Sequence, residues 1–249
     1  MPTKWLRKRP DFLKVNILVA ILFFVSAASA QLVNENITKQ DVIEILMLPL
    51  KERLMRLKTI DGVRDRLRLL AFDTHEGLDV RWRSLTALGT LACKSYRWEI
   101  EEALKSKEWF MRNAGLLAIL HDERNVAIQW SKKLLHDPAL VVRTQAVKNL
   151  MELRAESRDE IWSGLFAKEN FHEARGLWVR GYMAQALALW ATRTDEKRFL
   201  RLLMENDPVI QHWAVVGLER ATGIKMSNAD EPIALQKRKW LARLSSDQI

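Results

Sequence analysis

Val80-Arg81-Trp82-Arg83-Ser84-Leu85-Thr86-Ala87-Leu88 is the stretch that decides the fold, because its pattern returns along the chain. An apolar residue followed by Arg opens equivalent stretches at Met111-Arg112, Val142-Arg143 and Val179-Arg180, and Ile210-Gln211 opens a fifth. The intervals between the second residues of these pairs are 31, 31, 37 and 31. A nearly constant interval of this kind indicates an internal repeat.

The columns of the repeat predict a helix with one buried stripe. Three places after the Arg position the residues are nearly all small: Ser84, Gly115, Ala146, Met183 and Ala214. Six places after it they are again small, with one polar exception: Ala87, Ala118, Asn149, Ala186 and Gly217. Seven places after it they are large and aliphatic: Leu88, Ile119, Leu150, Leu187 and Leu218. These offsets share one helix face, so small residues let helices approach and the aliphatic column fills the layer between them.

A second amphipathic helix is predicted before four of the repeat helices. These segments carry apolar residues at three- and four-residue steps: 97–106, 125–135, 160–167 and 196–204. Two such helices with two short turns account for one repeat, so the unit is an antiparallel helix pair. Asp137-Pro138 and Asp207-Pro208 place a capping Asp before a Pro of the first helical turn. The longer interval predicts a six-residue insertion near 170–176, interpreted as a longer loop.

A further helix is predicted before the repeats. Thr38-x-x-Asp41 resembles a capping box that opens a helix to about Leu57, bent at Pro49. We therefore expect one domain over 31–249. Its parts are an N-terminal capping helix (31–58), the repeats (59–222) and a C-terminal cap (223–249).

Residues 1–30 have the pattern of a secretory signal peptide. Basic side chains come first: Lys4, Arg7, Lys8, Arg9 and Lys14. An apolar stretch from Val15 to Val25 follows, and then the small residues Ala28-Ser29-Ala30. The pattern predicts a periplasmic or secreted protein with no stable membrane span after cleavage. An uncleaved signal anchor is the alternative, although the apolar run is shorter than the roughly 20 residues of a spanning helix.

Composition favours helices and a sizeable core. Hydrophobic residues make up 48% of the chain and charged residues 29%, while nine Gly and six Pro are few for a β architecture. The formal net charge of +9 falls to about +5 without residues 1–30, so much of the apparent nucleic-acid signature belongs to the export signal. The single cysteine, Cys93, excludes an intramolecular disulfide.

The repeats resemble a known family. The pattern V-R-x-x-A-x-x-A-L after a short helix is similar to HEAT repeats, of the short type found in phycobilisome lyases and many bacterial proteins. It is carried by Val80-Arg81…Ala87-Leu88, Val142-Arg143…Ala146…Leu150 and Val179-Arg180…Ala186-Leu187, and the resemblance covers roughly residues 60–222. Ala221-Thr222-Gly223 followed by Trp240 is similar to the ending of many bacterial HEAT-repeat proteins, where a Thr-Gly turn leads to a Trp-bearing capping helix. The resemblance implies an all-α, right-handed α-solenoid of about five helix pairs.

The resemblance also assigns two groups of side chains. It implies a structural ladder in which each arginine at the repeat position meets an acidic residue or helix terminus of the next repeat: Arg81, Arg112, Arg143 and Arg180. It also implies that the second helices line a concave face. Side chains one, two and five places after the Arg point away from the core stripe and form the candidate partner-binding surface: Trp82, Arg83, Gln145, Lys148, Tyr182, Gln185, His212 and Trp213. The alternative for Trp82 and Trp213 is that they cover neighbouring repeats.

Other tryptophans are predicted in the core, because they lie in or beside apolar stripes: Trp98, Trp109, Trp130, Trp162, Trp178 and Trp190. No catalytic constellation stands out. The five histidines form no H-x-x-x-H or H-E-x-x-H pair, so no metal site is predicted. No phosphate-binding loop, dinucleotide fingerprint or nucleophile elbow is present, and no cofactor is predicted.

These observations predict an exported, non-catalytic adaptor that binds a protein or peptide on its concave face. One alternative is a nucleic-acid-binding protein that resembles the HEAT-repeat alkylpurine DNA glycosylases, against which the export signal argues. The other is a lyase-type HEAT enzyme that acts on a chromophore–protein substrate. The repeats favour an architecture and not an activity, because function resides in sites grafted on a fold.

Overall fold

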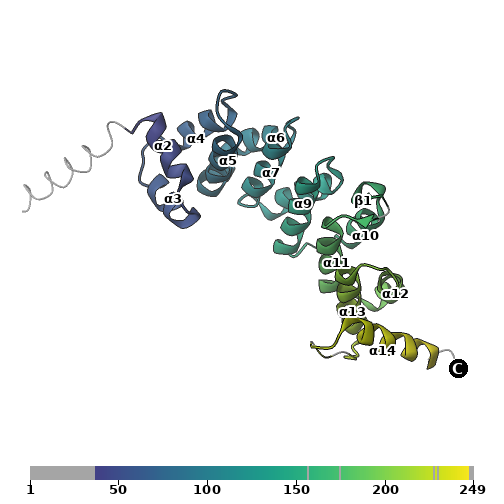
Figure 1. The fold of residues 1–249 in the computed structure, drawn as a ribbon. Coiled ribbons are helices and arrows are strands. Elements are labelled where there is room, and N and C mark those ends of the chain that lie inside the picture. The colour runs from purple at the N-terminus through teal and green to yellow at the C-terminus, as the bar shows by residue number, and fades with distance from the viewer. Residues whose placement is uncertain (1–36, 156, 174, 227, 229, 247–249) are drawn as a thin grey trace, which may run out of the picture. The chain divides into compact units, whose positions relative to one another are not determined.

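The computed structural model describes residues 37–155, 157–173, 175–226, 228 and 230–246 (Figure 1). Within these ranges the chain is mostly helical, with two short strands. The chain divides into two compact units between Arg66 and Leu67. The predicted signal peptide, 1–30, lies outside the described residues. Among the residues that are described, no helix is both long and apolar enough to cross a membrane.

The first unit contains α2 (Lys39–Met47) and α3 (Leu50–Leu57). The predicted capping box opens α2, because the Thr38 hydroxyl accepts the Asp41 backbone N–H at 3.2 Å and the Asp41 carboxylate accepts the Thr38 N–H at 2.7 Å. The capping box is thereby confirmed at this helix start.

Pro49 separates α2 from α3, so the prediction of one bent helix is wrong. Leu48 is extended, with ψ 160°, as expected for a residue that precedes proline. The chain therefore leaves the helix at Leu48 and begins a new one after Pro49. The buried Arg53 guanidinium donates to the Leu48 carbonyl oxygen at 3.0 Å and satisfies part of the helix end.

Helix α4 (Val63–Phe72) crosses the boundary between the units, and the remaining helices belong to the second unit. They are α5 (Leu78–Ala92), α6 (Arg97–Leu104), α7 (Trp109–Ile119), α8 (Arg124–Lys133), α9 (Leu140–Glu152), α10 (Arg158–Phe166), α11 (Val179–Leu189), α12 (Glu196–Leu203), α13 (Pro208–Thr222) and α14 (Ile233–Ser246). Short 3₁₀ turns connect some of them: Cys93–Tyr96, Leu134–His136, Lys168–Asn170 and Arg193–Asp195.

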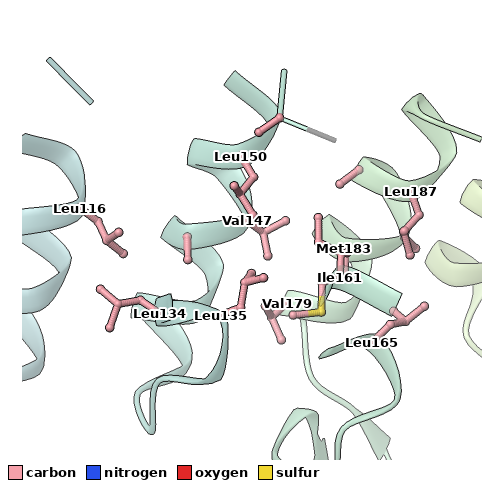
Figure 2. Packing of buried hydrophobic residues seen from close by; sticks show 14 of the residues in the cluster. Leu116, Leu134, Leu135, Val147, Leu150, Ile161, Leu165, Val179, Met183 and Leu187 are labelled. Atoms are coloured by element: carbon pink, nitrogen blue, oxygen red, sulfur yellow. The ribbon is translucent and has the colours of Figure 1, made fainter. Parts of the chain in front are cut away.

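Helices of the second unit pack in the order that the repeat predicts. The repeat helices α5, α7, α9, α11 and α13 contact one another in succession. Helices α6, α8, α10 and α12 each pack on the repeat helix that follows them. The aliphatic column is buried throughout: Leu88, Ile119, Leu150, Leu187 and Leu218. Figure 2 shows part of this core, with Val147 and Leu150 of α9 near Met183 and Leu187 of α11.

Small residues of the repeat helices lie where neighbouring helices approach closely. A Cβ added to Gly217 of α13 would come 2.4 Å from the buried Phe199 ring of α12. A Cβ on Gly89 of α5 would come equally close to the Ala118 side chain of α7. Small residues in these positions therefore set the spacing of the helices.

The last repeat and the C-terminal helix follow the predicted signals. The Asp207 carboxylate accepts the Val209 and Ile210 backbone N–H groups and caps α13. Gly223 ends this helix in a left-handed conformation, φ 73°, which glycine adopts at low cost. Helix α14 packs on α13, and its Trp240 is buried.

The insertion in the repeat forms a small hairpin and not an irregular loop. Strands β1 (Phe171–His172) and β2 (Arg175–Gly176) pair antiparallel between α10 and α11. Asn170 is buried at the base of this hairpin, where its side chain donates to the Gly164 carbonyl oxygen at 2.7 Å.

Candidate functional site

The arginines at the repeat position bind groups that precede the next repeat helix. Arg81 makes two hydrogen bonds to the Glu108 carboxylate, at 2.9 and 2.6 Å. Arg112 makes two to the Asp137 carboxylate, at 2.5 and 2.8 Å, and these bonds raise the pKa of the Arg112 guanidinium. Arg180 donates to Glu205 at 2.8 Å. These arginines and carboxylates therefore pair with one another and join successive repeats.

Arg143 is the exception, because it meets no carboxylate directly. Its guanidinium donates to the Asn170 side-chain oxygen and to the Asp137 and Glu169 carbonyl oxygens. Burial lowers the pKa of this guanidinium. Gln211, at the last repeat position, donates to the Glu205 carbonyl oxygen at 2.5 Å within its own turn.

Part of the predicted partner-binding surface is occupied by contacts inside the protein. The Trp82 indole N–H donates to the Asn113 side-chain oxygen at 3.0 Å, which links α5 to α7. The Gln145 amide donates to Asn149 on its own helix at 2.8 Å, and Asn149 donates in turn to the Leu116 carbonyl oxygen. Trp82 and Arg83, both on α5, do not line the cleft described next.

The other predicted residues gather over α9, α11 and α13. The Lys148 ammonium lies over the Tyr182 ring, 4.6 Å from its centroid. His212 and Trp213 make an edge-to-face contact with ring centroids 5.1 Å apart. Tyr182, Gln185 and Trp213 line one cleft between α11 and α13, so helix geometry brings together side chains that are up to 31 residues apart.

This cleft, which we call the aromatic cleft, has a volume of about 290 Å³. It is lined by Gly176, Leu177, Trp178, Gly181, Tyr182, Gln185, Asp207, Val209 and Trp213. Trp178 is 64% exposed and Val209 is 54% exposed, which is high for such large apolar side chains. Aromatic walls with a few polar groups are typical of surfaces that bind a partner side chain.

The inserted hairpin contributes one wall of the aromatic cleft through Gly176. Arg180 holds this hairpin against the repeats, because its guanidinium lies over the Phe171 ring, 4.2 Å from the centroid, and donates to the Leu165 carbonyl oxygen. A Cβ on Gly176 would come 2.6 Å from the Arg180 guanidinium. Insertions in repeat proteins commonly build the binding face, and this one is anchored in place.

The prediction that six tryptophans belong to the core is wrong for three of them. Trp98 is 71% exposed, Trp109 is 46% exposed, and Trp178 borders the aromatic cleft. Trp98 is two residues before the buried Ile100, and Trp109 is two before the buried Met111. Two residues correspond to about 200° around a helix, so these rings point away from the core. The signal that identifies Trp178 is its position two residues after the end of the insertion at Gly176.

A second and larger cleft, of about 660 Å³, lies in the same unit. Its apolar lining includes Leu69, Phe72 and Trp98, and its polar lining includes Arg68 and Glu99. None of the predicted partner-binding residues reaches it. We therefore take the aromatic cleft as the candidate site, because three of the predicted side chains line it: Tyr182, Gln185 and Trp213.

Cys93 is buried next to Asp122, and its thiol donates to the Asp122 carboxylate at 3.6 Å. Burial, and after it the negative charge of Asp122, raises the pKa of the Cys93 thiol to about 12. The thiol therefore stays protonated at neutral pH, whereas the thiolate is the reactive form. Among the residues that the structure covers, no three His, Cys, Asp or Glu side chains gather in a metal-binding arrangement.

Iodoacetamide is expected to alkylate Cys93 in the folded chain at least about a hundredfold more slowly than in urea at pH near 8, because both burial and the raised pKa suppress the thiolate. Mass spectrometry of the alkylated chain over time measures the two rates. Equal rates in the folded and unfolded chain would show that the thiol is accessible and ionised, contrary to its position beside Asp122.

Comparisons with known proteins add little to this site. No protein-family model matches the chain, and no curated protein matches it. Among solved structures, the chain is similar to the crystal structure of an engineered protein from the Northeast Structural Genomics Consortium, with 16% sequence identity and a TM-score of 0.44. The match covers 74% of this chain and 89% of the engineered one. A likeness this distant carries no conclusion about function.

Proposed function

We propose that this chain is an exported, non-catalytic adaptor that binds a protein or peptide segment in the aromatic cleft. In this proposal the second unit is a HEAT-like solenoid, and the second helices of its repeats present the binding face. The succession of contacts from α5 to α13 supports such a stack. Export rests on the sequence of residues 1–30, which have the pattern of a signal peptide.

The proposal rests on the set of side chains that line the aromatic cleft. Tyr182, Gln185 and Trp213 are placed there by the repeat, and the hairpin that interrupts the repeat adds the exposed Trp178 beside them. Trp178 is 64% exposed, so most of its side chain does not stabilise the core. An exposed tryptophan can stabilise a complex instead, since Trp and Tyr dominate interface energetics. A volume of about 290 Å³ suits one or two side chains of a partner.

A photocrosslinker at position 178 tests the proposal. Benzoylphenylalanine in place of Trp178, in the tagged full-length chain expressed in its native cells, is expected to form a crosslink with one envelope protein. The matched control carries the same group in place of Met204, which is 57% exposed and lines neither cleft. Trp213→Ala, combined with the label at 178, is expected to reduce the yield about tenfold, as for a typical aromatic hot spot.

Equal crosslinking at positions 178 and 204 would contradict the adaptor proposal, because the aromatic cleft would then be no better a contact point than any exposed apolar side chain. A crosslink to nucleic acid at position 178 would contradict it as well, and would favour the nucleic-acid alternative.

A further inference from the structure

We propose that the segment bound in the aromatic cleft is an acidic peptide, in which an apolar side chain enters the cleft and carboxylates on either side meet Lys148 and Arg175. This inference rests on the proposed function and adds the chemistry of the partner. It follows from which charges around the cleft are already paired within the protein and which are not.

Lys148 borders the cleft from α9. Its side chain is exposed, and its only described contact is with the Tyr182 ring, which lines the cleft. No carboxylate among the described residues pairs with it. The contact with Tyr182 holds the ammonium beside the aromatic wall, where a carboxylate of a bound peptide can reach it.

Arg175 lies on the inserted hairpin, next to Gly176 of the cleft lining. It lines an adjoining hollow of about 470 Å³ that shares Gly176 and Asp207 with the aromatic cleft. Arg175 is exposed, and within the described part of the chain it has no carboxylate partner. The two hollows therefore adjoin, and the unpaired Arg175 lines the second.

The carboxylates near the cleft are engaged within the protein. Glu205 accepts a hydrogen bond from Arg180 at 2.8 Å, and the Asp207 carboxylate caps α13 by accepting two backbone N–H groups. Glu205 is therefore paired with Arg180, and the N-terminus of α13 offsets the charge of Asp207. Lys148 and Arg175 are the cations at this site that no described carboxylate pairs, and they are complementary to an acidic segment with an apolar residue.

A peptide fits these observations better than single-stranded nucleic acid. Nucleic-acid sites combine stacking aromatics with a continuous basic track along the phosphates. Here the basic residues that line the two hollows are Arg175 and Arg180, and Arg180 is paired with Glu205, so the lining forms no continuous basic track. A strand of closely spaced phosphates would therefore meet only isolated cations, whereas a peptide can place its acidic residues beside Lys148 and Arg175 alone.

Three fluorescent peptides with the same Leu-Phe-Leu centre, flanked by glutamates, serines or lysines, test the inference. Fluorescence anisotropy with the purified full-length chain at low salt is expected to show the glutamate peptide binding about tenfold more tightly than the lysine peptide. Added salt is expected to reduce this preference, since the cations are exposed.

Charge reversal provides the decisive variants. Lys148→Glu with Arg175→Glu is expected to invert the preference, so that the lysine peptide binds more tightly. The matched control is Lys94→Glu with Lys197→Glu, which changes the net charge equally at exposed positions that line none of the clefts named above. This control is expected to keep the preference for the glutamate peptide.

The outcomes separate the two proposals. Equal binding of all three peptides, abolished by Trp178→Ala, would overturn the acidic partner and leave the aromatic cleft as a binding site. No binding of any of the peptides would overturn both the acidic partner and the cleft as a peptide site. Tighter binding of a single-stranded oligonucleotide than of the glutamate peptide would overturn the inference in favour of nucleic acid.

Discussion

Arg112→Ala is expected to lower the free energy of unfolding by about 3–5 kcal/mol, because it leaves a buried carboxylate without its partner. The Asp137 side chain is 2% exposed, and both of its oxygens accept from Arg112. Asp137 also accepts the Ala139 backbone N–H at 2.8 Å at the start of α9. The substitution therefore affects the joint between the repeat helices α7 and α9. Urea unfolding followed by far-UV circular dichroism measures the loss.

Lys105→Ala is the control for this prediction. Lys105 pairs with Glu102 on the surface, where the side chains are 51% and 46% exposed, so its removal is expected to cost less than about 0.5 kcal/mol. The double variant Arg112→Met with Asp137→Asn removes both charges, and its loss is expected to fall short of the summed single losses by at least about 1 kcal/mol. Equal losses for Arg112→Ala and Lys105→Ala would show that the buried pair does not stabilise the joint.

Phe199→Ala is expected to cost about 3–5 kcal/mol, because the phenyl ring is fully buried between α12 and α13. The ring makes an edge-to-face contact with Trp162, with centroids 5.2 Å apart, and closes over Gly217. Its removal leaves a cavity that the repeats on either side can fill only in part. Thermal unfolding and urea unfolding of the purified variant measure the effect.

Gly217→Ala tests the same contact from the other side. Its added Cβ meets the Phe199 ring, so the substitution is expected to destabilise by about 1–3 kcal/mol in spite of the higher helix propensity of alanine. In the double variant with Phe199→Ala the new methyl group occupies part of the cavity, and the two losses are expected to be less than additive. Strict additivity would mean that these two positions do not contact each other in solution.

The sequence by itself determined the helical register of the second unit. Offsets within one repeat depend only on helix geometry, so the stripe that contains Leu88 and Leu218 was predictable and is buried. The start of α2 at Thr38 and the cap of α13 at Asp207 were predictable for the same reason, because a capping side chain bonds backbone groups two or three residues away. Tyr182, Gln185 and Trp213 could also be assigned to one face, since their offsets from the repeat position place them there.

Only the tertiary structure decided which of these side chains form a site. Trp178 lies outside the periodic stripe, and its exposure depends on where the inserted hairpin folds back. That hairpin is held by Arg180, whose partners Leu165 and Glu205 are fifteen and twenty-five residues away in the sequence. Lys148 and Arg175 likewise lack a carboxylate partner because Glu205, a nearby carboxylate, pairs with Arg180. Periodicity describes one helix at a time, whereas a cleft and its unpaired charges are set by contacts between helices that the local pattern does not contain.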